Sequence, residues 1–550
     1  MRMEPIELAM GVEVEQLQAP MLLSANSMAA ALLALMAMVT LVAVSHLVSS
    51  WRSPRLPPSP PGRLPVIGHL HLLRPPVHRT LYKLAARLGP LMHIRLGSTH
   101  CVVVSSAGAA RELIHSHDAA ISGRPITALA RMFSYGSAGF AFTPYSNQWR
   151  FLRRLCVSEV LAPRVVEQLR AVRRASLVSL LRAVRASSAR GEEVDLTREL
   201  IRFSNTSIIR MVASDDDVNV ADEAQELVKL VTGLLGAFNV EDYVPLCRGW
   251  DLQGLRRTAA GVHRRFDAVL EQMIRHKEAA REHGRRAVTP QEDKKAEAPA
   301  ATHERSKDLL DILLDNAEDE TAEVKLTREN MKAFITDVVT AGSDSSAATV
   351  EWMLAELMNH PDAMRKVRDE IDTVVGRDRI VGEADLPRLP YLQAAFKETL
   401  RLHPGAPIAH RESTREVAVG GFTLPPQTAV FINLWAIGRD ASVWEEPLVF
   451  RPERFLPGGA AQGLEPRGQH FQFIPFGSGR RGCPGMGLAQ QSVPAVLAAL
   501  VQCFDWADAV ADGQTAVIDM DESDVGLVCA RKHPLLLRPT ARLNPFPAVV

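Results

Sequence analysis

The densest group of residues that could do chemistry is the window 476–485, which reads FGSGRRGCPG. Gly477, Gly479 and Gly482 in this window have the spacing G-x-G-x-x-G of a dinucleotide-binding turn, and Asp505 lies about 20 residues further on, where a ribose-binding acid is expected. Prolines on both sides of the glycines argue against the strand and the helix start that such a turn requires. A dinucleotide site is therefore the weaker interpretation.

The stronger interpretation makes Cys483 a thiolate ligand of haem iron, which donates electron density to the metal and favours cleavage of an O–O bond. Glycines such as Gly485 then let the backbone pass close to a flat macrocycle and aim amide N–H groups at the sulfur. Phe476 would shield the sulfur from water, and Arg481 would pair with a haem propionate. A buried cysteine that binds nothing is the alternative.

A second polar group interrupts a helical pattern. The segment 341–346, which reads AGSDSS, lies inside a pattern that begins near Leu326, so a glycine and several polar side chains fall in the middle of a helix. Both features cost helix stability, and a functional reason for them is expected. A helix whose Ser and Asp side chains face solvent is the alternative.

The elements that must position these residues are mostly helices. A period of 3.6 residues predicts helices over 107–117, 149–183, 221–236, 253–283, 327–360 and 392–402. Short apolar runs predict strands over Met92–Arg95, Cys101–Val104 and Ala429–Asn433. The stretch 283–307 is rich in charged residues, alanine and proline, and predicts a solvated loop. Together these patterns predict one large, mainly α domain.

Composition excludes several classes of protein. The 550 residues are 47% hydrophobic, which is ample for a large core. Because 63 Lys and Arg balance 63 Asp and Glu, the net charge is zero and nucleic acid is not an expected partner. The six cysteines lie far apart and form no C-x-x-C pair, which argues against a zinc site, a redox dithiol and a disulfide scaffold.

The N-terminal region predicts a membrane anchor. Residues 28–48 form an apolar run without formal charge, which as a helix would span roughly 30 Å. Arginines follow this run, whereas residues 1–27, an extension of no evident role, carry more Glu than Arg. This bias places the body in the cytosol, with the endoplasmic reticulum as the expected membrane. A cleaved signal peptide and a buried soluble helix are the alternatives. Residues 49–65 form a basic, proline-rich hinge.

The motifs as a set resemble those of the cytochrome P450 family of haem-thiolate monooxygenases. The ligand loop of that family reads F-x-x-G-x-R-x-C-x-G, and every fixed position is present around Cys483. The E-x-x-R and P-E-R-F motifs of the family are matched at 398–401 and 452–455. A spacing of three residues puts Glu398 and Arg401 on one helix face, where they would form with Arg454 a buried ion triad behind the haem.

The resemblance also implies contacts to the haem propionates. Trp149 and Arg153 match the W-x-x-x-R motif, so both side chains would reach the propionates, and Arg411 lies where the family often has another propionate partner. A basic stretch surrounds Trp149, on the side where the family docks its acidic flavoprotein reductase. It either steers electron delivery or is simply a solvated face, and consists of Arg150, Arg153, Arg154, Arg164, Arg170, Arg173 and Arg174.

The segment 341–346 resembles the A-G-x-D-T-T/S motif of the family. The small residues Ala341 and Gly342 would leave space for dioxygen, and Asp344 and Ser345 would relay protons to its distal oxygen atom. Serine stands where the family usually has threonine, which keeps the hydroxyl but loses the methyl group that restricts its rotamer. This change bears on the efficiency of coupling and leaves the reaction class as it is.

The resemblance extends from about Pro57 to the end of the chain. It implies a cytochrome P450 fold, mainly α with small β-sheets, preceded by a single transmembrane helix, with a catalytic domain over 66–550. It also implies haem b, with Cys483 on the iron, and electrons that NADPH supplies through cytochrome P450 reductase.

For the substrate, the chain is most similar to the flavone synthase II and flavanone 2-hydroxylase group of grasses. The stretches that carry this similarity are 97–101, 204–212, 236–243, 251–257 and 349–352. It implies oxidation of a flavanone such as naringenin at C2, in a pocket walled by Phe140, Phe238 and Phe334 and bordered by the hairpin near Val525. The alternatives are another phenylpropanoid or terpenoid as substrate, a reductase-independent isomerase or dehydratase, and a non-catalytic binding protein.

Overall fold

The computed structural model describes residues 55–213, 218–288, 307–508, 517–524, 526–543 and 546, together with positions 33, 36, 37 and 40. The chain divides into two units, Met1–Arg55 and Leu56–Val550. The extension 1–27 and Val525 lie outside the described residues, as does the predicted anchor 28–48 except at the four positions named, which are helical. The fold described below is that of the second unit.

The described part of this unit is mainly helical, as predicted. Its helices are α2 (Val77–Leu88), α3 (Ala107–Arg111), α4 (Ala128–Phe133), α5 (Asn147–Leu155), α6 (Pro163–Gln168), α7 (Arg170–Arg190), α8 (Leu196–Val212), α9 (Val218–Gly236), α10 (Leu255–Val288), α11 (Leu309–Glu318), α12 (Arg328–Asn359), α13 (Pro361–Val374), α14 (Pro390–Leu402), α15 (Leu434–Ile437) and α16 (Met486–Cys503). Short helical turns are η1 (Leu70–Leu72), η2 (Glu112–Ser116), η3 (Cys156–Val160), η4 (Val240–Asp242), η5 (Pro245–Cys247), η6 (Glu383–Arg388), η7 (Pro452–Phe455) and η8 (Gly479–Arg481).

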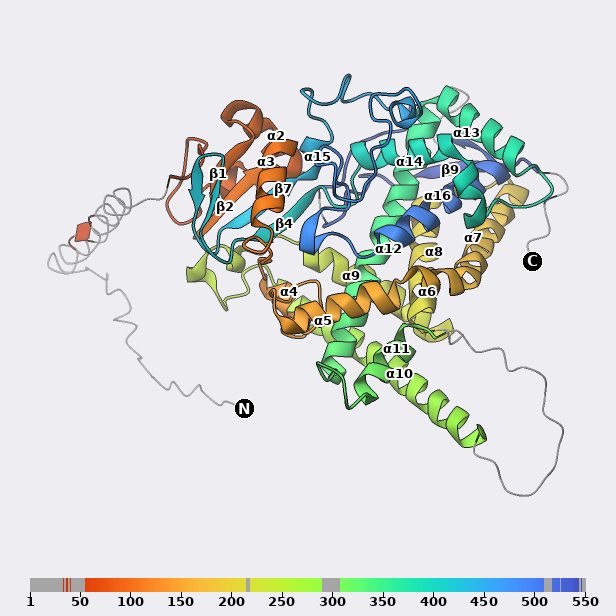
Figure 1. Ribbon diagram of the computed structural model, residues 1–550, viewed down its shortest axis with the longest axis horizontal. Helices are drawn as coiled ribbons and strands as arrows, with labels where there is room; N and C mark the ends of the chain where they lie inside the picture. Colours follow the sequence, from red (N-terminus) through yellow and green to blue (C-terminus); the bar gives the residue numbers. More distant parts are fainter. Residues whose placement is uncertain are drawn as a thin grey trace, which may run out of the picture. The chain divides into compact units, whose positions relative to one another are not determined.

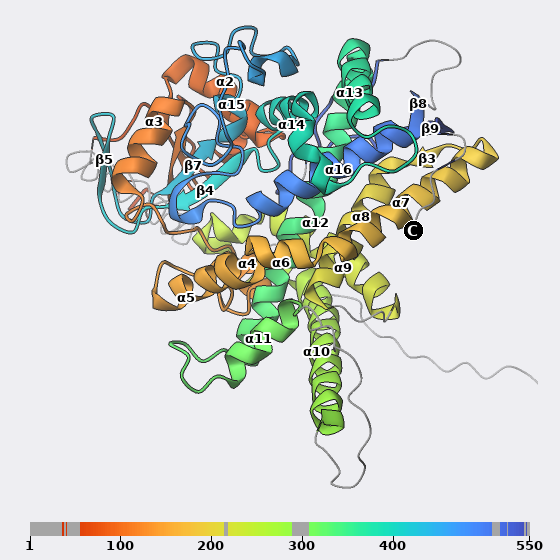
Figure 2. The same ribbon diagram turned by 45° about the vertical axis from the view of Figure 1, so that its right-hand side comes forward.

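The strands form three small sheets. They are β1 (Leu91–Leu96), β2 (Thr99–Val104), β3 (Val194–Asp195), β4 (Ile408–Glu412), β5 (Val417–Val419), β6 (Phe422–Leu424), β7 (Ala429–Asn433), β8 (Phe504–Asp508) and β9 (Leu536–Ala541). The sheet orders are β1-β2-β7-β4, β3-β9-β8 and β5-β6. The pair β2–β7 is parallel, and β4 pairs with β7 so that Arg411 lies opposite Val430. In Figures 1 and 2 the four-stranded sheet lies at one side of the unit, and α7, α8, α13 and α16 lie at the other.

The predicted strands are confirmed, and five of the six predicted helices are found within a few residues of their predicted ends. The exception is 149–183, which was wrong as a single helix because the chain breaks into α5, α6 and α7. Pro163 is the first residue of α6, where its missing N–H costs nothing, although it would interrupt a longer helix. The predicted loop 283–307 begins later than expected, because α10 continues to Val288.

Helix α12 joins the two largest clusters of buried side chains. Its first half, up to Val339, packs with α5, α9, α10 and α11, and its second half, from Ala347, packs with α7, α13, α14 and α16. The residues between, 340–346, have only small or polar side chains. A capping box fixes the start of the helix, since Thr327 and Asn330 each accept the other's backbone N–H. The polar segment therefore lies where neither cluster fills the space.

Helix α16 is also a core element. Among the described residues it is the one helix long and apolar enough to span a bilayer, yet 67% of it is buried within the protein. A helix that is apolar all round shows no 3.6-residue pattern, which explains why periodicity did not reveal it.

We expect Trp352 of α12 to contribute strongly to stability. Its ring is 1% exposed, lies 4.0 Å from the His403 ring, and its Nε1 donates to the Cys529 carbonyl at 2.6 Å. Trp352→Phe should lower the free energy of unfolding by about 1–3 kcal/mol, because it removes a buried hydrogen bond. Urea titration measures this. Trp250→Phe, at a side chain 69% exposed, is the control and should change the value by less than about 0.5 kcal/mol. Equal changes in the free energy of unfolding for the two variants would contradict this expectation.

Candidate active site

The glycine-rich loop is held in a tight turn in front of α16. The Cys483 amide donates to the Phe476 carbonyl at 2.8 Å, and Gly477 and Gly479 have φ values of +70° and +67°, which favour glycine. A Cβ on Gly479 would lie 2.5 Å from Oδ1 of Asp118, whose carboxylate accepts backbone and side-chain hydrogen bonds of the next residue. These glycines are thus required by the turn itself.

Cys483 combines exposure of the residue with a protein environment around its thiol. The residue is exposed, yet the protein atoms that surround it raise the pKa of its thiol. Hydrogen bonds from the Gly485 and Met486 amides and the charge of Arg153 lower that pKa. Because α16 begins at Met486, its N-terminal dipole also favours a thiolate here. The site has the donors that a metal-bound sulfur needs.

A second buried cysteine does not offer the same chemistry. The ligand atoms of His78, Glu522 and Cys529 all lie within 4.8 Å of one another. Glu522, however, already binds His78 at 2.6 Å and Trp435 at 2.7 Å, and burial together with the Glu522 charge raises the pKa of Cys529 well above its usual value. Cys529 is therefore a poor thiolate, and this cluster serves to hold the C-terminal segment against α2 and α15.

Arg481 holds the loop onto neighbouring segments. Its guanidinium donates to the carbonyls of Ser122 at 2.8 Å, Phe140 at 3.2 Å and Thr143 at 2.5 Å. It also lies over the Trp149 ring at 4.7 Å, while the Trp149 indole N–H donates to the Phe140 carbonyl at 3.0 Å. The structure thus places Trp149 as a platform beneath Arg481, with its N–H already engaged rather than directed at a propionate.

Two other predicted arginines bind the backbone of the same loop. Arg153 of α5 donates to the Gly482 carbonyl, directly before Cys483. Arg411 of β4 donates to the Ser478 carbonyl at 3.1 Å, and its Nε has no hydrogen-bond partner. Arg153, Arg411 and Arg481 come from distant parts of the sequence, and the fold brings them together at one loop.

A fourth arginine, Arg124, completes a cluster of like charges that sequence reasoning missed. Burial lowers the pKa of Arg124, Arg153 and Arg411 and brings that of Arg481 to about 9, and repulsion from neighbouring arginines adds to this at Arg124, Arg411 and Arg481. Asp337 counters Arg124 and Arg481, Asp118 counters Arg411, and burial raises the pKa of Asp337 to about 6. The Nε of Arg124 also lacks a hydrogen-bond partner. The cluster fits a ligand with anionic edges, such as the two propionates of haem.

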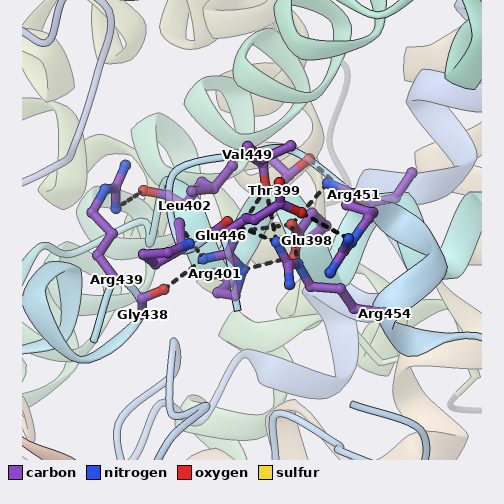
Figure 3. A network of polar contacts seen from close by, with 12 residues as sticks. Glu398, Thr399, Arg401, Leu402, Gly438, Arg439, Glu446, Val449, Arg451 and Arg454 are labelled. Atoms are coloured by element: carbon purple, nitrogen blue, oxygen red, sulfur yellow. Dashed lines mark hydrogen bonds and ion pairs between the residues drawn. The ribbon is translucent and has the colours of Figure 1, made fainter. Parts of the chain in front are cut away.

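The predicted ion triad forms, as Figure 3 shows. Arg401 Nε and Nη2 each donate to Glu398 at 2.7 Å, and Arg454 Nε donates to Glu398 at 3.2 Å. The remaining Arg401 donors reach the carbonyls of Gly438 and Pro447, both at 2.7 Å. The Glu398 and Arg401 side chains are 0% exposed, so the pairing is essential for charges buried this deeply. The triad ties α14 to η7 and the loop before it.

The polar segment of α12 presents different faces to different neighbours. Ala341 is exposed in the middle of the helix, and the Ser345 hydroxyl, one turn on, donates to the Ala341 carbonyl at 2.7 Å. A Cβ on Gly405 would lie 3.7 Å from Ser345, so the stretch after Pro404 adjoins this face. Gly342 faces Ile208 of α8, 3.1 Å from a Cβ placed on it, so its small size also serves helix packing, and its role in leaving space for dioxygen stays a prediction.

Asp344 points toward α9. Its Oδ2 accepts a hydrogen bond from Thr232 at 2.6 Å, and its Oδ1 has no partner. Burial raises the pKa of Asp344, although the Thr232 hydrogen bond and the Lys229 charge oppose the increase. Nothing in the sequence singles out Thr232, because its contact with Asp344 exists only in the packed structure. A carboxyl group with a raised pKa is suited to hold and release a proton.

The three phenylalanines predicted as pocket walls differ in how far their side chains are exposed. Phe334 is 0% exposed within a core cluster, with its ring 5.0 Å from Phe140, so it lines no open space and its prediction was wrong. Phe140 is 7% exposed, and Phe238 is 50% exposed and stacks on Tyr243 at 5.3 Å. Aromatic residue type alone could not separate a core side chain from a wall.

The hairpin expected to border the pocket meets two other segments. Gly236, at the end of α9, lies so close to the C-terminal hairpin that a Cβ on it would be 2.7 Å from Gly526. The Cys529 amide of the same hairpin donates to the Gly405 carbonyl at 3.0 Å. The end of α9, the hairpin and the stretch after Pro404 therefore share one region beside Ser345.

The basic stretch around Trp149 is largely neutralised. Arg154 pairs with Glu323, and Arg170 and Arg173 pair with Glu383. Arg153 is directed at the Cys483 loop. Among the described residues, the members that show no carboxylate partner are Arg150, Arg164 and Arg174. Only this part of the stretch presents free positive charge to a partner.

Comparison with known proteins places the fold and the loop in one class, the haem-thiolate monooxygenases. The chain belongs to the cytochrome P450 family, whose model matches residues 57–537. It is 69% identical to cytochrome P450 93G1 of Oryza sativa subsp. japonica, covering 92% of this chain and 93% of that protein. It is 44% identical to 3,9-dihydroxypterocarpan 6A-monooxygenase of Glycine max, covering 90% and 94% of the two chains.

A solved structure supports the same fold. A zebrafish cytochrome P450 with progesterone has a TM-score of 0.67 over 85% of this chain and 99% of that chain, at 24% identity. The fold class predicted from the sequence is thereby confirmed, and so is the enzyme class. Membership of the family implies a haem whose iron is bound by a cysteine thiolate, and reduction by NADPH through a reductase.

We expect Arg401→Lys to prevent accumulation of the folded haem protein. Lysine cannot supply the forked pair of hydrogen bonds to Glu398 together with the hydrogen bonds to the carbonyls. The free energy of unfolding should therefore fall by about 3–5 kcal/mol. The readout is the yield of the carbon monoxide complex of the reduced haem protein, measured by its difference spectrum. The control is Arg451→Lys, since the Arg451 side chain pairs with Glu445 and Glu446 at the surface. Normal yield from Arg401→Lys would contradict the structural argument.

Proposed function

We propose that this protein is a membrane-anchored cytochrome P450 that oxidises a flavanone at C2, using dioxygen and electrons from NADPH delivered by cytochrome P450 reductase. The product would be a flavone such as apigenin or a 2-hydroxyflavanone. The observation that carries the proposal is Cys483, which is exposed directly before α16 and whose thiol receives amide hydrogen bonds from Gly485 and Met486.

The haem would be held between the Cys483 thiolate and the arginine cluster. Cys483 would ligate the iron, and Arg124, Arg153, Arg411 and Arg481 would supply positive charge for the propionates. Bound haem supplies the activation of dioxygen and the transfer of one oxygen atom. Phe476 would exclude water from the sulfur, and the amide donors would reduce its basicity. The Glu398, Arg401 and Arg454 triad would support this side of the site from behind.

Asp344 and Ser345 would supply the protons that reduction of dioxygen consumes. The raised pKa of Asp344 means that its carboxyl holds a proton closer to neutral pH than an ordinary aspartate does. Ser345 lies on the exposed Ala341 face, and its oxygen keeps lone pairs that can accept a proton while its hydroxyl donates to the Ala341 carbonyl. The pair would thus connect the α9 side of α12 to the face where substrate is oxidised.

A flavanone fits the region where the end of α9, the C-terminal hairpin and the stretch after Pro404 meet. Apolar pockets with few polar anchors suit flat phenolic molecules. The relative at 44% identity is named for a dihydroxypterocarpan, which supports a polycyclic phenolic substrate for this chain as well. Turnover of another phenylpropanoid or of a terpenoid would replace the flavanone as the proposed substrate.

The setting we propose is the endoplasmic reticulum membrane. Residues 28–48 would form a single anchor, 49–65 a stiff hinge, and the catalytic domain from 66 to 550 would face the cytosol. The reductase would dock on the α5 side, where Arg150, Arg164 and Arg174 present unpaired charge for steering an acidic partner.

Turnover by the full chain in microsomes with a plant reductase tests the substrate. With naringenin and NADPH, we expect apigenin directly, or a hydroxylated flavanone that becomes flavone after acid treatment, identified by mass spectrometry. Cys483→Ala should abolish the product and the carbon monoxide difference spectrum, whereas the matched control Cys247→Ala should keep both. A normal spectrum without product would rule out the flavanone but not the monooxygenase. A normal spectrum from Cys483→Ala would rule out the ligand assignment.

We expect Thr232 to position the Asp344 carboxyl group. Thr232→Val removes a hydrogen bond worth about 1 kcal/mol, so the fraction of NADPH electrons that reach product should fall roughly fivefold, with hydrogen peroxide in their place. Thr232→Ser keeps the hydroxyl and should remain near wild type. Because the Thr232 bond lowers the pKa of Asp344, the valine variant should shift the pH profile of coupling upward. Equal coupling and unshifted profiles in both variants would refute this assignment.

A further inference from the structure

A cavity of about 320 Å³ lies between α7, α8, η6 and α16, apart from every residue assigned above to haem, dioxygen or substrate. Its volume is at the lower end of the range of small-molecule sites, roughly 300–1,000 Å³. The floor is apolar and combines aliphatic side chains with one aromatic ring. It is formed by Leu177, Val178, Leu181, Phe203, Ala495 and Val496.

The acidic residues that line this cavity are already neutralised. The Glu383 carboxylate accepts hydrogen bonds from Arg173 Nε at 2.7 Å and from Arg173 Nη2 at 2.6 Å, which makes a forked ion pair. The Asp385 carboxylate accepts two hydrogen bonds from Arg379, both at 2.7 Å. These pairs leave neither carboxylate available to attract a cation from solution.

The lining carries four arginines against two carboxylates, so positive charge is in excess. Arg174 is exposed and has no carboxylate partner among the described residues. Arg170 binds Glu167 through Nη2, but its Nε is buried without a hydrogen-bond partner and lies 3.7 Å from Glu383, beyond hydrogen-bond distance. A buried N–H without an acceptor costs about 1–3 kcal/mol, which an incoming anion would recover.

We propose that this cavity binds a small amphipathic anion, with an apolar body on the floor and an anionic head group on Arg170 and Arg174. A neutral apolar molecule would leave the Arg170 Nε unsatisfied, and a cation would be repelled by the excess guanidinium charge. The site is separate from catalysis, since its contact with α16 lies at Ser492 to Val496, beyond the turn that begins at Met486.

Calorimetric titration of the full-length holoprotein with decanoate tests the site. An azole that ligates the haem iron is present throughout, so that binding in the catalytic pocket is blocked. We expect one saturable site, and at least roughly tenfold weaker binding of decanol, which lacks the charge. A retained carbon monoxide spectrum shows that any failure belongs to this site and not to the haem assignment.

Variants separate this cavity from other surfaces. Arg174→Glu should weaken decanoate binding roughly tenfold or more, because it reverses a charge at the rim. Val178→Phe should abolish binding by filling the floor. Arg164→Glu, which reverses another unpaired charge on α6, should leave the affinity unchanged. Absent saturable binding, equal affinity for decanol, or binding that persists in Arg174→Glu and Val178→Phe would overturn the proposal.

Discussion

The repulsion among four buried guanidinium groups is the constraint on which the rest of the site depends. Arg153, Arg411 and Arg481 hold their positions because backbone carbonyls of the Cys483 loop and its neighbours accept their hydrogen bonds, and Arg124 lies close enough to lower the pKa of Arg411 and Arg481. Carbonyl dipoles stabilise such charges, but the two carboxylates that counter them, Asp337 and Asp118, cannot balance four guanidinium groups. An anionic cofactor would therefore complete the electrostatics of this interior, and the loop proposed to ligate its metal is the same loop that the arginines hold.

Helix α12 shows how the fold keeps space open in an otherwise dense interior. Its two halves belong to different clusters of buried side chains, so the helix is fixed at both ends while 340–346 stays free of large residues. A glycine and serines in mid-helix would destabilise an isolated helix. Here the packing on either side supplies the stability that the polar segment lacks, and Asp344 and Ser345 can point to different neighbours from adjacent positions.

The sequence predicted those parts of the site that are contiguous. The window around Cys483, the pair Glu398 and Arg401, and the segment 341–346 are short patterns in which spacing alone carries information. Arg124, Asp337 and Thr232 escaped prediction because each acquires its partners only through tertiary packing. For the same reason, residue type placed Phe334 in a pocket when the core encloses it, and a continuous helical pattern concealed the break at Pro163.

The close approach of Gly236 to Gly526 bears on how such a protein could acquire new substrates. At this point the backbone of α9 and the backbone of the C-terminal hairpin touch without an intervening side chain. A single methyl group on residue 236 would push the hairpin away and reshape one border of the substrate region, while Cys483, the arginine cluster and Asp344 would stay where they are. Divergence of specificity among relatives can therefore begin at one glycine, without change to the residues proposed to hold haem and to relay protons.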